Sequence, residues 1–451
     1  MRNYLKKAPP RQPRDVGRVE ETVRRMLAEI AAERDEAVRR YARQLDKWEK
    51  AEFRVSDDEI RRTARELPET FKEDFAYCHR QVTEFARRQR DSLSEFEVEL
   101  QPGVRLGQKL IPIATVGCYI PGGKYPLVSA AIMSVGTARV AGVEHIVAAA
   151  PPRDGAGIFP PTLYALHASG ADEIFVLGGV QAMAAMAYGC LGMRAVDLVT
   201  GPGNAFVAEA KRQLFGAVGL DLIAGPTEIC VIADDSADPA LIATDLLGQA
   251  EHGPDSPAWL ITTSDALGRA VIAEVEAQLR TLPTAEVASV AWRDHGEVVV
   301  VGSDEEAIAV SDAYAPEHLE VMTRRNDLYL AGLRNYGSLF LGEECTVAYG
   351  DKGVGTNHTL PTGKAARYTG GLWVGKFIKT VTYQRLSAEA SRQIAPIMSR
   401  VCHVEGMLAH QITADVRFQR YAPHNLPAGS TAGSTAGGPG GGPATTASKG
   451  G

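Results

Sequence analysis

Between residues 103 and 263 the chain alternates short apolar runs rich in β-forming residues with Ala-rich helical runs. A strand that is apolar along its whole length must be covered on both faces, and helices between successive strands supply that cover. The pattern therefore predicts βαβ units around a parallel sheet. It resumes at residues 298–342, and a repeat this long predicts two open α/β sheets. The strand candidates are residues 111–120, 145–151, 173–179, 195–201, 228–234, 258–263, 298–303 and 337–342.

The bulk properties limit the class of protein. At 451 residues the chain exceeds what one hydrophobic core usually serves, so we expect two or more domains. A net charge of −7 argues against nucleic acid as the main partner, because a phosphate-binding surface needs concentrated Lys and Arg. The six cysteines form no CxxC pair, which is typical of free thiols in a reducing compartment. The first residues lack the apolar core of a signal peptide and no apolar run has membrane-spanning length, so we expect a cytoplasmic protein without membrane contact.

Both ends of the chain are predicted to be helical. Apolar residues recur at helical spacing from Val16 to Trp48, and Ser56 with Glu59 forms a capping box that opens another helix. After Thr380 we expect helices again. The Gly/Ser/Thr-rich tail from Ala428 has nothing to pack, so we expect it to be disordered.

A candidate metal site begins at the end of a predicted helix. The apolar run around Leu246 ends in Gln249 and His252, and Gly253 and Pro254 then stop the helix. Gln249 and His252 are three residues apart, so they project from the same side of the last turn. An amide oxygen and an imidazole nitrogen suit a divalent metal. The alternative is a histidine that only caps helix carbonyls.

A second candidate site is the adjacent pair Glu317 and His318. Neighbouring residues do not share a helical face, so we expect this pair in a loop that reaches one pocket from two angles. An imidazole titrates near neutrality and a desolvated carboxyl can be tuned upward, so the two could divide general acid–base work. A surface Glu-His pair without a function is an equal alternative.

Residues 350–363 form a glycine-punctuated stretch that looks like a ligand-binding loop. Turn chemistry explains its glycines and Asn357, but it does not explain His358. Asp351 adds a carboxylate.

Further along the chain, Glu405 and His410 are five residues apart, so they converge only if Gly406 breaks the helix. His403 is a competing candidate. Two imidazoles, one carboxylate and one amide would leave room for substrate on a catalytic zinc ion. That set is Gln249, His252, Asp351 and His410.

Open parallel sheets bind ligands at the carboxyl ends of their strands. We place four Gly-rich turns at such ends, residues 121–123, 178–179, 201–204 and 225–227. Asn204 is a predicted N-cap, where backbone N–H groups can meet a phosphate. No GxGxxG fingerprint occurs before the tail, so glycines that merely form tight turns are an equal alternative.

At this point the motifs resemble those of a known family, the histidinol dehydrogenases, from about Val16 to Arg417. The matching segments are VGCYIPGG, GPGNAFVAEAKR, AGPTE, DLLGQAEHGPDS, APEHLE and GDKGVGTNHTLPT. Together they are highly specific. The resemblance implies a zinc-containing, NAD-dependent homodimer that oxidises a primary alcohol to a carboxylate through a bound aldehyde, in two hydride transfers.

The resemblance also implies roles for individual residues. Glu317 and His318 would be the acid–base pair. Carried over by motif, the zinc ligands would be Gln249, His252, Asp351 and His410, and they would also touch the substrate. His410 would reach the active site of the partner subunit. The NAD contacts would be Tyr119, Gln181 and Asn204, and the other substrate contacts Thr227, His318, His358 and Glu405. A non-catalytic metal- and nucleotide-binding module is the alternative class, but retention of the pair beside all four ligands argues against it.

The implied domains are two Rossmann-like open sheets, one inserted in the other. The first would comprise residues 16–118 with 228–371, and the inserted domain residues 119–227. An N-terminal arm (1–15), a helical C-terminal segment (372–427) and the tail (428–451) complete the chain.

The segment after LPT is more similar to a paralogous branch of the family, the sulfopropanediol 3-dehydrogenases, which oxidise (R)-2,3-dihydroxypropane-1-sulfonate to 3-sulfolactate. A sulfonate is an anion and needs a fixed cation, whereas histidinol is itself a cation. Arg367, Lys364 or Lys124 could supply the charge, Arg367 best because its fork can pair two sulfonate oxygens. Glu405 better suits an ammonium, so oxidation of L-histidinol to L-histidine is the alternative.

Overall fold

The structure is a computed structural model that describes residues 3–10, 16–122, 125–153 and 155–422. It forms two compact units. The first comprises Met1–Ser94 with Leu110–Lys379, and the second Glu95–Lys109 with Thr380–Gly451. Within the described ranges, no helix is long and apolar enough to cross a membrane. The predicted disordered tail lies outside these ranges.

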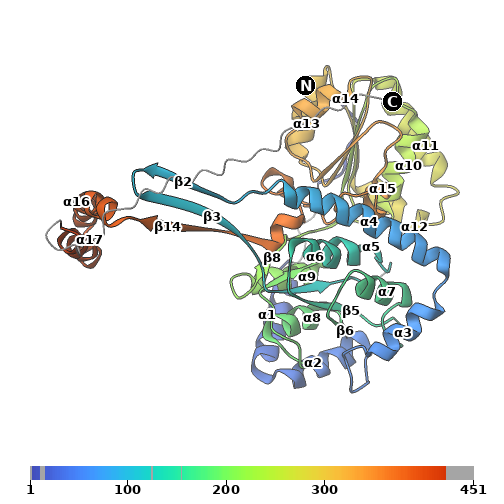
Figure 1. Ribbon diagram of the computed structural model, residues 1–451. Coiled ribbons are helices and arrows are strands. Elements are labelled where there is room, and N and C mark those ends of the chain that lie inside the picture. The colour runs from blue at the N-terminus through green and yellow to red at the C-terminus, as the bar shows by residue number, and fades with distance from the viewer. Residues whose placement is uncertain (1–2, 11–15, 123–124, 154, 423–451) are drawn as a thin grey trace, which may run out of the picture. The chain divides into compact units, whose positions relative to one another are not determined.

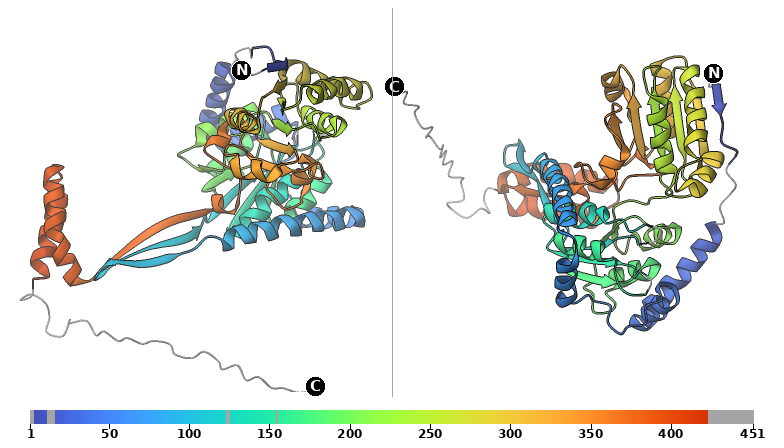
Figure 2. Two further views of the ribbon diagram at one scale, coloured as in Figure 1. Left: turned by 90° about the horizontal axis from the view of Figure 1, so that it is seen from above. Right: turned by 90° about the vertical axis from the view of Figure 1, so that its right-hand side faces the viewer.

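The first unit contains a six-stranded sheet (Figure 1). Its strands are β1 (Asn3–Lys6), β9 (Ile229–Ala233), β10 (Ala258–Thr262), β11 (Gly296–Val300), β12 (His318–Met322) and β13 (Ser338–Leu341). The order is β1-β11-β10-β9-β12-β13, and all neighbours are parallel except β1, which runs antiparallel at the edge (Figure 2). After β9, the chain adds β10 and β11 on one side of it and then β12 and β13 on the other side. This is the Rossmann-like order that we expected.

Alternate residues of this sheet face two separate cores. In β9, Val231 belongs to the core of one face and Ile232 to the core of the other. Burial on both faces explains the continuous apolar strands, so the parallel α/β prediction is confirmed. The covering helices are α10 (Pro239–Ala250), α11 (Asp265–Gln278) and α12 (Ala285–His295) on the first face, and α13 (Asp304–Tyr314) and α14 (Asn326–Gly332) on the second.

The first unit also contains a five-stranded parallel sheet with the order β6-β5-β4-β7-β8. As in the six-stranded sheet, the chain adds two strands on one side of its first parallel strand and then two on the other. Its strands are β4 (Thr115–Tyr119), β5 (His145–Ala150), β6 (Glu173–Val176), β7 (Leu198–Thr200) and β8 (Gly219–Leu220). The helices between them are α5 (Ser129–Ala131), η2 (Ile132–Gly136), α6 (Thr137–Ala141), α7 (Pro160–Ala168), α8 (Gly179–Tyr188) and α9 (Ala205–Leu214). The glycine turns after β4, β6 and β7 lie at carboxyl ends, as predicted.

The N-terminal helices share one hydrophobic core with the five-stranded sheet, although the sequence analysis grouped them with the other sheet. They are α1 (Val16–Glu33), α2 (Asp35–Tyr41), η1 (Ala42–Asp46), α3 (Asp57–Glu66) and α4 (Glu69–Asp91). The exact domain bounds remain a prediction. The predicted helix start is confirmed, because Ser56 is the N-cap of α3 and its side chain accepts a hydrogen bond from the Glu59 backbone N–H.

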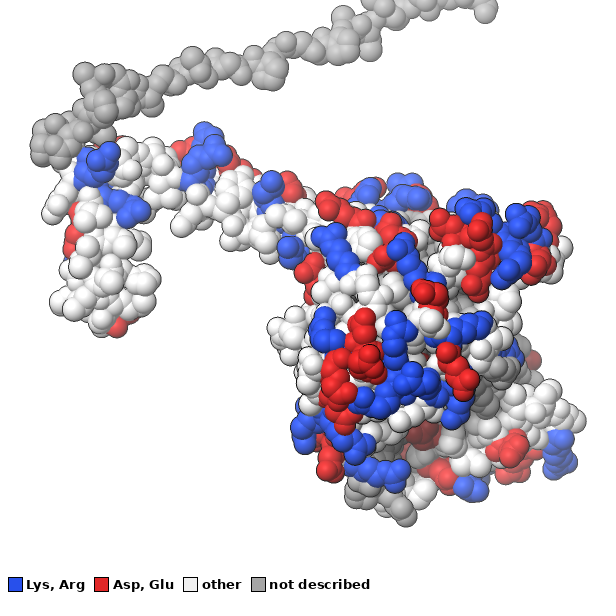
Figure 3. All heavy atoms as spheres, turned by 90° about the horizontal axis from the view of Figure 1, so that it is seen from below, with Lys and Arg blue, Asp and Glu red and all other residues white. Residues whose placement is uncertain are grey.

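The charged faces of these helices carry ion pairs between neighbouring turns. Arg24 pairs with Glu20, Arg61 with Asp58, and Arg88 with Glu84. On the face drawn in Figure 3, Lys and Arg side chains lie beside Asp and Glu side chains. Such mixed pairs are typical of a solvated helix face.

The second unit consists of a three-stranded sheet and two helices. Our prediction that the chain is helical from Thr380 is wrong for β14, in which the β-branched and aromatic residues Val381, Thr382 and Tyr383 favour a strand. Gly406, with φ 71°, separates the two helices, so the predicted break is confirmed. The elements are β2 (Phe96–Gln101), β3 (Val104–Pro112), β14 (Ile378–Leu386), α16 (Ala388–Val404) and α17 (Leu408–Arg420), with sheet order β14-β3-β2.

Candidate active site

The predicted acid–base pair lies at the amino end of the six-stranded sheet. β12 begins at His318, directly after Glu317, and pairs with β9, which begins two residues after Thr227. The expected loop is therefore wrong for His318, which opens a central, fully buried strand. The turn at residues 225–227 also precedes its strand, because the chain re-enters the six-stranded sheet there after β8. Our placement of that turn at a carboxyl end is wrong.

Glu317 is held by two hydrogen bonds on one carboxylate oxygen. Its Oε2 accepts from the Thr227 hydroxyl at 2.6 Å and from the Glu228 backbone N–H at 2.9 Å. The residue is only 6% exposed. Burial raises the pKa of Glu317, and the nearby His318 and the two hydrogen bonds only partly offset this effect. A buried carboxyl with a raised pKa is suited to moving protons near neutral pH.

The two ring nitrogens of His318 differ in their contacts. Its Nδ1 lies 3.0 Å from the Glu228 carbonyl oxygen, which can only accept a hydrogen bond, so Nδ1 carries a proton. Its Nε2 is buried and, among the described residues, has no hydrogen-bond partner. The nearest carboxylate oxygen is Oδ1 of Asp351 at 3.5 Å, which is an electrostatic contact and too long for a good hydrogen bond.

The carboxylates around His318 control its charge. Burial alone lowers the pKa of His318, but Glu317 and Asp351 together outweigh burial and raise it to about 9. Burial raises the pKa of Asp351, but contact with His318 and the charge of His358 lower it to about 2. The two residues therefore stabilise each other as an imidazolium and a carboxylate.

Two predicted ligands come from the end of α10, as the sequence suggested. The Gln249 amide nitrogen donates to the Thr227 hydroxyl and lies 3.2 Å from His318 Nδ1. His252 lies two residues after the end of α10, directly before Gly253, which stops the helix. Burial lowers the pKa of His252, which favours the neutral imidazole that binds metals.

Asp351 lies near the end of the short helix α15 (Val347–Lys352), and the chain then folds back so that His358 contacts it. The Nδ1 of His358 donates to the backbone oxygen of Asp351 at 2.6 Å. Burial lowers the pKa of His358, and the carboxylate of Asp351 partly offsets this effect. The structure thus brings the Asp351 and His358 segment to the acid–base pair.

These side chains surround one cavity of about 160 Å³. Arg367 and Lys364 are exposed in and before η3 (Ala365–Arg367) and do not line it. Lys124 lies outside the described residues. Glu405 and His410 belong to the second unit, where both are exposed. The predicted residues that do line the cavity are Thr227, His252, Glu317, His318, Asp351 and His358.

The fit to a metal ion is partial within the first unit. In the ranges that the structure describes, no three His, Cys, Asp or Glu side chains converge as a metal cluster. Of the four proposed ligands, only His252 and Asp351 are of these types in this unit, and Gln249 adds an amide oxygen. Three mixed donors with a neutral imidazole suit zinc, whose fourth ligand would be water, the substrate or a further residue.

A second cavity, of about 590 Å³, lies at the carboxyl end of the five-stranded sheet and is lined by Tyr119, Gln181 and Asn204. Asn204 caps α9, since its side chain accepts from the N–H groups of Phe206 and Val207. The sequence analysis missed Asp46, whose Oδ2 accepts from the Gly178 N–H at 3.0 Å and from the Gln181 amide at 2.9 Å. No motif marks Asp46, which ends an amphipathic helical run.

The glycine turn beside this cavity is tightly packed. Gly201 has φ +119°, and a Cβ at this position would lie 2.0 Å from the Tyr119 carbonyl oxygen. We expect Gly201→Ala to lower stability by about 1–3 kcal/mol through backbone strain and to weaken NAD binding, because the turn must move. Urea unfolding and NAD titration check this, with Gly216→Ala as the control, since Gly216 also has positive φ (+101°) but no neighbour within 4 Å. Equal effects of the two variants would show that the close approach of residue 201 to the Tyr119 carbonyl oxygen does not matter.

Comparison with known proteins decides the family. The model of the family described as histidinol dehydrogenase matches residues 10–418. The chain belongs to the histidinol dehydrogenase family. A histidinol dehydrogenase homolog of Shouchella clausii is 53% identical over 90% of this chain and 95% of its own length. The sulfopropanediol 3-dehydrogenase of Ruegeria pomeroyi is 48% identical, covering 93% of this chain and 97% of its own.

The fold agrees with that of a solved member of the family. The crystal structure of histidinol dehydrogenase from Elizabethkingia anophelis has a TM-score of 0.85 with this chain at 34% identity. The match covers 92% of this chain and 94% of that one. As a histidinol dehydrogenase family member, the protein is an oxidoreductase, and both cavities described above lie within the matched residues.

Proposed function

We propose that this protein is a zinc- and NAD-dependent dehydrogenase that oxidises a small polar primary alcohol to the carboxylate through a bound aldehyde. The observation that carries the proposal is His318, which lines a cavity together with Glu317 and Asp351 and whose buried Nε2 has no hydrogen-bond partner among the described residues. A buried polar atom without a partner is costly, so it favours a ligand group there. A substrate hydroxyl would satisfy it.

The chain's own residues then divide the proton transfers. A bound zinc ion would offset the charge of Asp351 and favour neutral His318, whose Nε2 would then take the alcohol proton while the Glu228 carbonyl holds Nδ1–H and fixes the ring. The hydrate of the aldehyde forms when Glu317 removes a proton from water, and the Thr227 hydroxyl keeps its Oε2 in place.

Gln249, His252 and Asp351 would hold the zinc ion, and Tyr119, Gln181 and Asn204 would contact NAD. Bound zinc would polarise the alcohol oxygen and offset the charge of Asp351, and bound NAD would accept hydride. We further propose a homodimer in which His410 and Glu405 complete the site of a second copy, which would supply the missing fourth ligand.

For the substrate we propose an anionic alcohol, (R)-2,3-dihydroxypropane-1-sulfonate, which would yield 3-sulfolactate. The Ruegeria pomeroyi relative bears the name of that activity. Arg367 and Lys364 do not line the cavity, but Lys352 does, with its Nζ 3.9 Å from Asp351. Among the described residues that line the cavity, Lys352 is the cation that would pair the sulfonate.

The substrate proposal predicts a selective defect. Lys352→Gln should raise KM for the sulfonate about tenfold or more, because a hydrogen bond to a charged group is worth about 1.5–3 kcal/mol, and should leave KM for histidinol unchanged or lower. Initial rates of NADH formation with both alcohols, side by side, measure this. Lys376→Gln, a lysine outside the cavity, is the control. If the wild-type enzyme prefers histidinol, the proposed sulfonate substrate is wrong, but the proposed oxidation of an alcohol to a carboxylate still stands.

A further inference from the structure

Two acidic residues lie on elements of the candidate active site but outside its acid–base pair. Asp245 is on α10, four residues before Gln249. Glu320 is on β12, two residues after His318. Residues four apart on a helix, or two apart on a strand, share a face of that element. Glu320 is only 1% exposed, and Asp245 is half-buried.

Both carboxyl groups are bound at the start of α15. The Thr346 hydroxyl donates to Asp245 Oδ1 at 3.0 Å. The next residue, Val347, donates its backbone N–H to Glu320 Oε1 at 3.1 Å. Val347 begins α15, and Asp351 lies one turn further along the same helix. The two acidic residues therefore join α10, β12 and α15 at one point.

The other oxygen of Glu320 indicates a shared proton. If both side chains were ionised, Glu320 Oε2 would be buried without a hydrogen-bond donor among the described residues. Asp245 is the side-chain hydrogen-bond partner of Glu320, and such a bond between two carboxyl groups requires that one of them holds a proton. Burial and the charge of Asp245 raise the pKa of Glu320 well above its usual range, and the charge of His318 offsets only part of this effect. Glu320 is therefore the protonated member, and Asp245 accepts from it and from Thr346.

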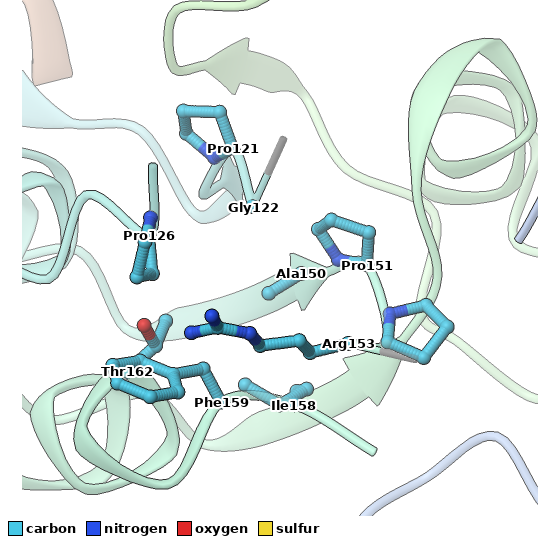
Figure 4. A pocket seen from close by; sticks show the side chains of 10 residues that line it. Pro121, Gly122, Pro126, Ala150, Pro151, Arg153, Ile158, Phe159 and Thr162 are labelled. Carbon is cyan, nitrogen blue, oxygen red and sulfur yellow. The ribbon is translucent and has the colours of Figure 1, made fainter. Parts of the chain in front are cut away.

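We propose that Asp245 and Glu320 share one proton and act as a positioning pair for the candidate active site. The pair would hold together the three elements that carry Gln249, His318 and Asp351. Neither acidic residue lines the active-site cavity, the dinucleotide pocket or the cavity of about 350 Å³ beside the turn after β4 (Figure 4), so the pair acts through the residues that it positions. The ligand and acid–base roles of those residues rest on the proposed function, whereas the shared proton does not.

Two substitutions of Glu320 in the full chain test the proposal. Glu320→Gln keeps a donor N–H where the carboxyl proton lies, so zinc affinity and kcat should stay close to those of the wild type. Glu320→Leu removes both the proton and the acceptor for the Val347 N–H. Its zinc affinity, measured by competition with a chelator, should fall about 10- to 100-fold, which is the usual cost of losing a group that orients metal ligands, and kcat should fall with it. Its affinity for NAD, measured by titration, should not change, because the dinucleotide pocket belongs to the other sheet.

Asp304→Leu is the matched control for a loss of stability alone. Asp304 is 6% exposed and accepts a hydrogen bond from the Tyr329 hydroxyl at 2.7 Å, on the opposite face of the same sheet. This variant should be less stable in urea but keep the zinc affinity of the wild type. Thr346→Val removes only the donor to Asp245 and should also weaken zinc binding, so it tests the pair even if Glu320→Leu does not fold.

The outcomes separate the shared proton, the positioning role and the proposed function. Equal losses of zinc affinity in Glu320→Gln and Glu320→Leu would show that the charge of a second carboxylate is needed, and would overturn the shared proton. Unchanged zinc affinity in both Glu320→Leu and Thr346→Val would overturn the positioning role. A wild-type protein that binds no zinc would contradict the proposed function instead. In that case Glu320→Gln should still be as stable in urea as the wild type and Glu320→Leu less stable, and equal stability of all three would overturn the shared proton.

Discussion

Glu317→Gln should slow the second oxidation about 10²–10⁴-fold while largely sparing the first, because proton transfer by a placed group typically contributes that factor. The substitution keeps the shape of the side chain and removes the carboxylate that would activate water. The carboxylate is buried, and the Thr227 hydroxyl and the Glu228 N–H hold one of its oxygens in place. His318, which would serve the first step, is retained.

Single-turnover traces of NADH formation separate the two steps. In the variant, one equivalent of NADH should appear at nearly the wild-type rate and the second should be delayed, with aldehyde accumulating on the enzyme. Glu276→Gln, an exposed residue of α11, is the matched control and should leave both phases unchanged. Equal loss in both phases would contradict the division of labour between Glu317 and His318.

Lys211→Met should lower the free energy of unfolding by about 3–5 kcal/mol, because it leaves a buried carboxylate without its partner. Lys211 is 3% exposed, and its Nζ contacts Asp221 Oδ1 at 2.5 Å and the Gly201 carbonyl at 3.0 Å. Asp221 in turn accepts from the Thr200 hydroxyl at 2.8 Å and the Gly201 N–H at 3.0 Å. The pair therefore holds the glycine turn of the dinucleotide pocket.

Urea unfolding of wild type and variant measures this cost. Arg212→Met is the matched control, since Arg212 is half exposed and pairs with Glu209 on the surface of the same helix. A surface pair is worth about 0–1 kcal/mol, so the control should lie within that range. Similar losses in the two variants would show that burial of the Lys211–Asp221 pair does not matter.

The sequence predicted those parts of the fold that depend on local periodicity. Helices α10 and α13 and, except for the two-residue strand β8, the strands between residues 111 and 303 could be recognised because each has a continuous apolar run or a helical repeat, with stop signals such as Gly253. β12 was missed because its five residues, HLEVM, include a histidine and a glutamate at buried positions. Polar residues in a central strand break the pattern, and here one of them, His318, belongs to the candidate site.

The site could be predicted only in part, because its contacts are long-range. Thr227 and Glu317 share a hydrogen bond across 90 positions of the chain, and no spacing rule links them. Asp46 lies 135 positions from Gln181, which it holds, and nothing around it resembles a motif. The guanidinium of Arg367 has the best chemistry for pairing a sulfonate, but this residue lies on an exposed turn. Lys352, which belongs to the motif of residues 350–363, lines the cavity instead. Residue type can be judged from sequence, whereas position within a cavity cannot.

Metal analysis of the purified protein tests the central claim most directly. If Gln249, His252 and Asp351, with His410, bind one divalent ion that anchors the alcohol, the wild type should contain about one zinc ion per chain. His252→Asn and Asp351→Asn should lose the metal and the activity together, whereas His145→Asn, a histidine that lies outside the cavity in β5, should keep both. A fully active wild-type protein without zinc, or an unchanged zinc content in both ligand variants, would contradict the account.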